Sequence, residues 1–222
     1  MVGVAKGSKP RSAFGGMKTT AVLMLKAPRP GTVKTRLAAG IGAGRAAEIY
    51  RSLVEGQLGE IPGNWATAIH FAPGDAESEM RAWLSPSVRT ASFVPQSEGD
   101  LGARMRAAAI HELERGADAV ALIGGDCPYL TREYLAEASG LAEGADVVIG
   151  PASDGGYVLL LLRQADAALF ENIDWSTSRV LEQTRQAARA HGLRYVEMDP
   201  LEDIDDYASL CRFESQQDTK FS

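Results

Sequence analysis

The sequence has only two cysteines, Cys127 and Cys211, and they stand far apart. It has no CxxC pair and no Cys/His spacing, so it suggests neither a structural zinc site nor a disulfide framework. Two unpaired thiols fit a reducing compartment, and we therefore expect a cytoplasmic protein.

Long apolar runs and an excess of basic residues are also missing. No run approaches the ~20 apolar residues that a membrane helix needs, so we expect no membrane contact. The formal net charge of −6 argues against nucleic acid as a partner, because nucleic-acid-binding domains are usually basic. The start of the chain lacks the apolar segment of a secretory signal. We interpret residues 1–18 as a disordered extension, with Met17 as a second candidate start.

What the 222 residues do contain is a regular alternation of short apolar runs and helical stripes. Strands are predicted at residues 21–25, 65–71, 88–94, 118–123, 146–149, 157–162 and 194–198. Helical patterns fill the intervals, and the last predicted helix ends near Cys211. This alternation predicts an α/β domain with a doubly wound, mostly parallel sheet. We place one domain at 19–213 and a flexible tail at 214–222.

Chemically active residue types follow five of the predicted strands. The stretches are KAPRPGTVKTR, PQSEGDLG, GGDCPYL, SDGGY and DIDD. The carboxyl ends of parallel strands meet at one edge of a sheet, and ligands bind outside that edge. The five stretches are therefore expected to line one site.

The first of these loops is basic. It carries Lys26, Arg29, Lys34 and Arg36 without an acid, in a chain of negative net charge. A basic, glycine-bearing loop between a strand and a helix can seat phosphates, because backbone N–H groups face the anion and the cations supply charge. A solvated basic turn has the same local pattern.

Acidic residues form a second candidate feature. Asp126 follows a buried strand and two glycines, and a carboxylate held there can ligate a hard cation such as Mg²⁺ or can cap a helix. Asp203 and Asp205 share one face of an extended stretch if Ile204 points inward, which would complete a metal site. A capping cluster for the last helix is an equal alternative.

Three other features are ambiguous from the residues alone. A polar turn, which can read the edge of a nucleobase or simply lead into a helix, consists of Gln96, Gly99, Asp100 and Gly102. The segment DGGY at 154–157 is mainly a hairpin signal. Trp175 can stack on a sugar or base, although an isolated Trp more often belongs to the core.

Nucleophilic catalysis has no clear carrier in the sequence. The three histidines, His70, His111 and His191, lie within or at the ends of predicted elements, away from the five loops. Nothing resembles a Ser–His–Asp or Cys–His site. Cys127 has no basic neighbour in sequence to lower its pKa, so we do not interpret it as a nucleophile.

The motifs KAPRPGTVKTRL, QSEGDLGARM, GGDCPYL, GPASDGGY and IDWSTSRVLEQT, in this order, resemble those of the DUF2064 family. That family is also described as arsenosugar-biosynthesis-type glycosyltransferases of the nucleotide-diphospho-sugar transferase (GT-A) superfamily. The resemblance covers roughly Thr20 to Leu210. It implies a three-layer, Rossmann-like fold that binds a nucleoside di- or triphosphate at its strand ends, with Mg²⁺ or Mn²⁺.

The resemblance also implies roles for matching residues. Phosphate binding falls to Lys26, Pro30, Gly31, Lys34 and Arg36. Recognition of the nucleobase falls to Gln96, Gly99, Asp100, Gly102 and Arg104. The sugar or acceptor side falls to Asp154, Gly155, Gly156, Tyr157, Trp175 and Ser176. The metal ligands are Asp126, Asp203 and Asp205. Two departures are Asp206-Tyr207 where the family usually has Thr-Pro, and an unbroken leucine run at 159–162 where a glycine is common.

These roles predict a metal-dependent transferase that uses a nucleotide-activated donor and a small-molecule acceptor. Asp126 with its cation, Lys34 and Arg36 would stabilise charge on the departing diphosphate. Asp154 would orient or deprotonate the acceptor. We expect a glycosyltransferase acting on a nucleotide sugar. The alternatives are a nucleotidyltransferase with an NTP donor, like the phospholactate guanylyltransferases and molybdopterin cytidylyltransferases, and a nucleotide-binding module without catalysis.

Overall fold

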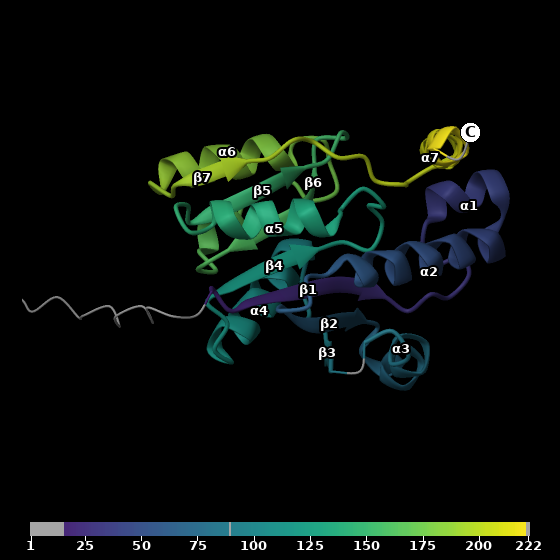
Figure 1. The fold of residues 1–222 in the computed structure, drawn as a ribbon, viewed down its shortest axis with the longest axis horizontal. Coiled ribbons are helices and arrows are strands. Elements are labelled where there is room, and N and C mark those ends of the chain that lie inside the picture. Colours follow the sequence, from purple (N-terminus) through teal and green to yellow (C-terminus); the bar gives the residue numbers. More distant parts are fainter. Residues whose placement is uncertain (1–15, 89, 221–222) are drawn as a thin grey trace, which may run out of the picture.

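The computed structural model describes residues 16–88 and 90–220, with side chains as far as residue 217 (Figure 1). Most of the predicted N-terminal extension, and the end of the predicted tail, lie outside the described residues. The first strand begins at Thr19, directly after the predicted extension.

Seven strands form one sheet in the described part of the chain. They are β1 (Thr19–Lys26), β2 (Ala66–Ala72), β3 (Ser92–Pro95), β4 (Ala119–Ile123), β5 (Val147–Pro151), β6 (Tyr157–Leu162) and β7 (Tyr195–Glu197). Their order is β3-β2-β1-β4-β6-β5-β7, and every pairing is parallel except those of β6 with β4 and β5. The prediction of a mostly parallel sheet is confirmed.

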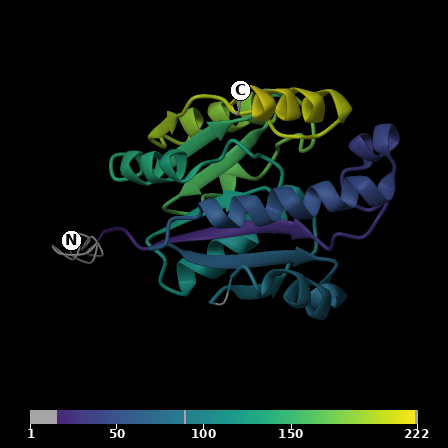
Figure 2. The ribbon, with the colours of Figure 1, turned by 45° about the vertical axis from the view of Figure 1, so that its right-hand side comes forward.

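Helices cover both faces of this sheet. They are α1 (Thr35–Ile41), α2 (Ala43–Glu60), α3 (Glu77–Leu84), α4 (Leu101–Glu114), α5 (Arg132–Leu141), α6 (Val180–Ala190) and α7 (Tyr207–Lys220). Two short 3₁₀ turns span Gly74–Ala76 and Ala167–Leu169. One core cluster joins α2, α3 and α5 to the sheet, and a second joins α4 and α6 to its other face. Figure 2 shows α2 lying across one face of the central strands.

The central strand β1 shows why the sheet is buried on both sides. Successive side chains of a strand point to opposite faces. Leu23 and Leu25 therefore pack into the cluster under α2, while Val22 packs into the cluster under α4, and all three are fully buried. An unbroken apolar run is the sequence signature of such a strand.

Several element boundaries differ from the prediction. Strand β3 begins at Ser92, because Val88 N–H still donates to Leu84 O at the end of α3. Helix α6 begins at Val180, since the preceding residues form a hydroxyl-rich turn in which Thr177 Oγ1 donates to Asp174 O. The predicted basic loop is shorter in the structure, because Lys26 ends β1 and Arg36 lies in helix α1, which buries Leu37.

The last helix is longer than predicted. Helix α7 continues to Lys220, well beyond Cys211 and into the segment predicted as a flexible tail. Side-chain contacts hold this extension: the rings of Phe213 and Tyr129 lie 5.9 Å apart, and Tyr129 OH donates to Gln216 Oε1 at 2.8 Å. Helix α7 also packs beside α1 (Figures 1 and 2).

Within the described part of the chain, none of the helices combines the length and apolar character needed to cross a bilayer.

Candidate functional site

Three carboxylates meet at the carboxyl edge of the sheet. Asp126 lies in the loop after β4, and Asp203 and Asp205 lie in the segment before α7; one oxygen from each falls within 4.8 Å of the others. Ile204 N–H donates to Asp126 O at 3.0 Å, and the Ile204 side chain is buried. The sequence predicts that Asp203 and Asp205 share one face if Ile204 points inward, and the structure shows Ile204 buried. The structure therefore brings the three predicted metal ligands together.

Lys34 neutralises part of this acidic centre. Its Nζ lies 3.0 Å from Asp126 Oδ2 and 3.0 Å from Asp205 Oδ1, and its side chain is only 6% exposed. Burial alone would lower the Lys34 pKa, but the two carboxylates outweigh burial and the pKa lies above its usual value. Lys34 is therefore charged at neutral pH.

The backbone of Lys34 is in the left-handed region, with φ 47° and ψ 47°. This conformation costs a residue with a Cβ about 1–2 kcal/mol. Such strain persists where the surroundings require it, and it often marks a functional position. Here the strain accompanies a side chain placed between two carboxylates.

The acidic centre still has an excess of negative charge. Burial, followed by the charges of Asp126, Asp205 and Asp154, raises the pKa of Asp203 to about 6. Arg36 Nη1 lies 3.4 Å from Asp205 Oδ2 but its side chain is 72% exposed, so it compensates little. Closely spaced carboxylate oxygens with too little compensating charge suit a hard divalent cation such as Mg²⁺. The residues therefore fit the ion that the family resemblance implies.

Two glycines make room for this arrangement. A Cβ on Gly124 would lie 2.8 Å from Asp126 Oδ1, and a Cβ on Gly125 would lie 2.7 Å from side-chain atoms of both Leu25 and Val54. The structure shows that these glycines admit neighbouring side chains of the protein.

A cleft of about 810 Å³ opens beside the acidic centre. Its volume is in the usual range for small-molecule and cofactor sites, about 300–1,000 Å³. Among the residues that the sequence assigned to the site, those that line the cleft are Lys26, Lys34, Arg36, Asp126, Asp154, Gly156, Tyr157, Trp175, Ser176, Asp203 and Asp205.

The other predicted site residues do not line this cleft. They are Pro30, Gly31, Gln96, Gly99, Asp100, Gly102, Arg104 and Gly155. Gln96 braces the strand ends, because its Nε2 donates to the carbonyls of Leu25 and His70 while its Oε1 accepts from Arg104 Nη1. Asp100 caps α4 by accepting from Ala103 N–H. Nucleobase recognition by this group stays a prediction.

Two of these glycines nevertheless support the wall of the cleft. A Cβ on Gly102 would lie 2.3 Å from Trp175 Nε1, so only glycine lets Trp175 pack against α4. Gly155 has φ 92°, and a Cβ there would lie 2.3 Å from Ser178 O. At both positions the absence of a side chain lets the turn at 175–178 approach closely.

Several cleft residues escaped the sequence analysis. Tyr50 was not among the predicted site residues, yet it lines the cleft, and its hydroxyl accepts from Lys26 N–H at 3.1 Å. Burial raises the pKa of Tyr50, which keeps it neutral. Thr177 and Ser178 also line the cleft, and neither was among the predicted site residues. The run of hydroxyls in WSTS was the only available signal.

Two residues near the motifs face elsewhere. Arg29, from the basic loop, pairs with Glu79 of α3 at 2.9 Å. Cys127 is buried, its Sγ donates to Glu202 O, and burial raises its pKa to about 12. A thiol with such a pKa is not a nucleophile at neutral pH, in agreement with the prediction.

Fold and site together define an α/β protein of the nucleotide-diphospho-sugar transferase fold. A crystal structure from Desulfovibrio desulfuricans G20, described as a "putative nucleotide-diphospho-sugar transferase", is 31% identical with a TM-score of 0.79 and covers 86% of this chain and 83% of its own. The 4-diphosphocytidyl-2C-methyl-D-erythritol synthase from Anaerococcus prevotii DSM 20548 is 9% identical with a TM-score of 0.60, covering 92% of this chain and 100% of its own. CMP:2-keto-3-deoxy-manno-octonic acid synthetase complexed with CTP is 10% identical with a TM-score of 0.56, covering 91% and 99%. The last two show the fold alone.

The family is also established. The profile described as "Uncharacterized protein conserved in bacteria (DUF2064)" matches residues 61–177, more than half of the chain. This protein therefore belongs to the DUF2064 family, which confirms the resemblance. The matched residues include Asp126 but not Lys34, Asp203 or Asp205. These three residues lie beside Asp126 only in the folded structure. No protein of curated function matches this chain.

Proposed function

We propose that this protein is a transferase that uses a nucleotide-activated donor and a divalent cation, specifically a glycosyltransferase acting on a nucleotide sugar and a small-molecule acceptor. The observation that carries the proposal is the acidic centre: three carboxylates within 4.8 Å, with a buried lysine between two of them, beside a cleft of about 810 Å³. The description of the 31% identical relative supports the same class.

Asp126, Asp203 and Asp205 would hold the cation, Mg²⁺ or Mn²⁺. When bound, such an ion supplies positive charge to the phosphate oxygens of the donor. Lys34 has three N–H donors, of which two point to Asp126 and Asp205. Its third donor is then available for a phosphate oxygen as charge builds on the leaving diphosphate. Such preorganised donors are each worth a few kcal/mol, roughly 10²–10³ in rate.

The acceptor side would be formed by the hairpin between β5 and β6. Asp154 is exposed and lines the cleft, and its Oδ1 accepts from Gly156 N–H at 2.9 Å. This hydrogen bond orients the carboxylate and leaves the other oxygen to accept a proton from an acceptor hydroxyl. Trp175 and Ser176, on the facing turn, would contact the sugar.

A nucleotidyltransferase is the second candidate. Lys26 and Arg36 line the same cleft and are exposed, which supplies cations for a third phosphate. In that reaction an NTP is the donor and pyrophosphate leaves. The leaving group therefore distinguishes the two reactions.

The test is a product analysis with a panel of nucleotide sugars and a panel of NTPs, each with Mg²⁺ and candidate acceptors. Release of a nucleoside diphosphate with transfer of the sugar is the expected result. Release of pyrophosphate from an NTP would favour the second candidate. If calorimetry detects no nucleotide binding and neither product forms, the proposal is wrong.

A further inference from the structure

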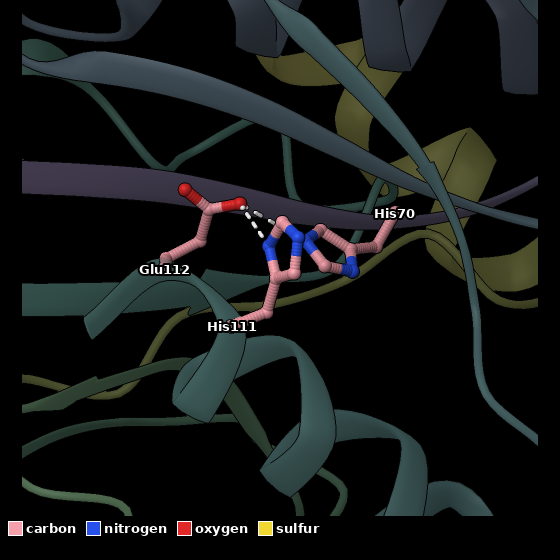
Figure 3. Close-up of side chains that lie close together, drawn as sticks. All are labelled: His70, His111 and Glu112. Atoms are coloured by element: carbon pink, nitrogen blue, oxygen red, sulfur yellow. Dashed lines mark hydrogen bonds and ion pairs between the residues drawn. The ribbon is translucent and has the colours of Figure 1, made fainter. Parts of the chain in front are cut away.

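A second cluster of potential metal ligands lies away from the cleft. His70 of β2 and His111 and Glu112 of α4 converge, as Figure 3 shows. His70 Nε2 lies 3.4 Å and His111 Nδ1 lies 2.9 Å from the same oxygen, Glu112 Oε1. One ligand atom from each residue lies within 4.8 Å of the others. Both imidazoles therefore face one carboxylate oxygen.

Burial distinguishes this cluster from a surface contact. The side chains of His70 and Glu112 are 3% and 6% exposed, whereas that of His111 is 39% exposed. Burial alone would raise the pKa of Glu112, but the hydrogen bonds from both histidines outweigh it and the pKa lies below the usual value. The neighbouring cation Arg115 is 4.0 Å from Glu112 Oε2 and 61% exposed, so solvent screens its charge. The carboxylate is ionised and largely desolvated.

The donor set fits a zinc site, and two of its three ligand separations are close to those of a tetrahedral ion. Two histidine nitrogens and one glutamate oxygen, with a fourth position open, form a known Zn²⁺ coordination. Ligands held tetrahedrally at about 2.0–2.1 Å from an ion stand about 3.3 Å apart. The two nitrogen–oxygen separations of 2.9 and 3.4 Å are close to that value without any movement of the backbone. The partial exposure of His111 provides an entry path for the ion.

We propose that His70, His111 and Glu112 bind a transition-metal ion, Zn²⁺ in particular, at a site independent of the acidic centre. Imidazole nitrogens suit Zn²⁺, whereas Mg²⁺ prefers oxygen ligands. The two sites should therefore prefer different ions. Each coordinating nitrogen must be unprotonated, so Nε2 of His70 and Nδ1 of His111 transfer their hydrogens to the other ring nitrogen, and a neutral imidazole releases no proton overall.

The ion would connect a strand to the helix that borders the cleft. His70 O accepts from Gln96 Nε2 at 2.8 Å, and Gln96 Oε1 accepts from Arg104 Nη1 of α4 at 3.2 Å. Gly102, near the start of the same helix, contacts Trp175 of the cleft wall. A metal bridge from β2 to α4 would therefore stabilise the helix against which Trp175 packs.

The experiment is a Zn²⁺ titration of the full chain by calorimetry, in excess Mg²⁺ so that the acidic centre is occupied. Wild type is expected to bind one Zn²⁺ and to gain thermal stability. His111→Asn and Glu112→Gln are expected to lose at least about 100-fold in affinity, because removing a ligand costs more than the ~10–100-fold lost with a group that only orients one. The matched control His191→Asn, at an exposed histidine after α6, should bind Zn²⁺ as wild type does.

Several results would overturn the proposal: no Zn²⁺ binding by wild type in excess Mg²⁺, unchanged affinity in His111→Asn, or loss of the site in Asp126→Asn. Far-UV circular dichroism checks that each variant is folded. If both ligand variants fail to fold, NMR of the wild type decides. Zn²⁺ should shift the imidazole signals of His70 and His111 and leave that of His191 unchanged, and any other pattern contradicts the proposal.

Discussion

The acidic centre and the histidine cluster differ in which groups neutralise or hydrogen-bond their carboxylates. In the acidic centre, the carboxylates of Asp126 and Asp205 are 33% and 39% exposed and share one buried ammonium group, that of Lys34. In the histidine cluster, Glu112 is buried and receives hydrogen bonds from two imidazoles. The first keeps unbalanced charge beside an open cleft, whereas the second is nearly satisfied internally. The proposed substrate chemistry therefore concerns the first cluster, and the proposed Zn²⁺ site concerns the second.

The largest expected effect concerns turnover at the acidic centre. Asp126→Asn keeps the size of the side chain but removes its charge, and turnover should fall about 10²–10³-fold because charge on the leaving group loses its stabilisation. The measurement is initial rate with the active donor at saturating Mg²⁺. The control is Asp118→Asn, an exposed aspartate just before β4 at the opposite edge of the sheet, which should retain the wild-type rate. Equal rates for the two variants would contradict the role of Asp126.

The second largest difference should be between the contributions of Lys34 and Arg115 to the free energy of unfolding. Lys34→Met leaves Asp126 and Asp205 without their buried partner, and the free energy of unfolding should fall by about 2 kcal/mol, less than for a fully buried pair because both carboxylates are partly exposed. Arg115→Met, beside Glu112, should change it by less than about 0.5 kcal/mol. Urea denaturation without divalent ions measures both. Mg²⁺ should restore part of the stability lost in Lys34→Met. Similar losses in the two variants would show that Lys34 is no more important for stability than Arg115.

A smaller effect should appear in the pH dependence of the acidic centre. The pKa of Asp203 is raised to about 6 in the fold, so its ionisation opposes folding. The metal-free protein should lose stability as pH rises from about 4 to 6, because the unfolded state releases this proton first. Asp203→Asn should be more stable than wild type by about 1 kcal/mol at pH 7, after discounting for solvent screening, and equally stable near pH 4. A stability difference between Asp203→Asn and wild type that does not change with pH would show that it does not come from the ionisation of Asp203.

The histidine cluster should show the opposite sign. The pKa of Glu112 is lowered in the fold, so its charged form contributes stability above the usual glutamate pKa of about 4.3, and this contribution is lost as pH falls through the lowered value. Glu112→Gln should therefore be less stable than wild type at pH 7, and the difference should narrow below pH ~4. Denaturation of both proteins across pH 3–7 tests it. A difference that widens in acid would refute the assignment.

Much of the fold and of the acidic centre could be predicted because their signals are local. Apolar runs such as 157–162 mark strands, and the loops after them lie at one edge of a parallel sheet, which was enough to bring Lys34 and Asp126 together. The left-handed backbone of Lys34 and its contact with both carboxylates have no sequence signal. The length of α7 could not be predicted from neighbouring residues, because its last turns contact Tyr129, which is far away in the sequence.

The histidine cluster could not be predicted for a similar reason. His70 and Glu112 are 42 positions apart and meet only because α4 packs on the face of the sheet toward which His70 points. Spacing rules for metal sites look for ligands close in sequence, and two isolated histidines carry no such pattern. Tyr50 was missed differently, because its ring packs with the apolar residues of the core while its hydroxyl accepts from Lys26 N–H.

The segment that carries Asp203 and Asp205 has a consequence for biosynthesis. It is held over the strand ends by Ile204 N–H on Asp126 O and by Ser153 N–H on Leu201 O, and Lys34 lies 171 positions from Asp205 in sequence. A chain still emerging from the ribosome would carry the basic loop and Asp126 without their late partners. Such a nascent chain lacks two of the three carboxylates, so the proposed cation site is complete only after residue 205 has docked.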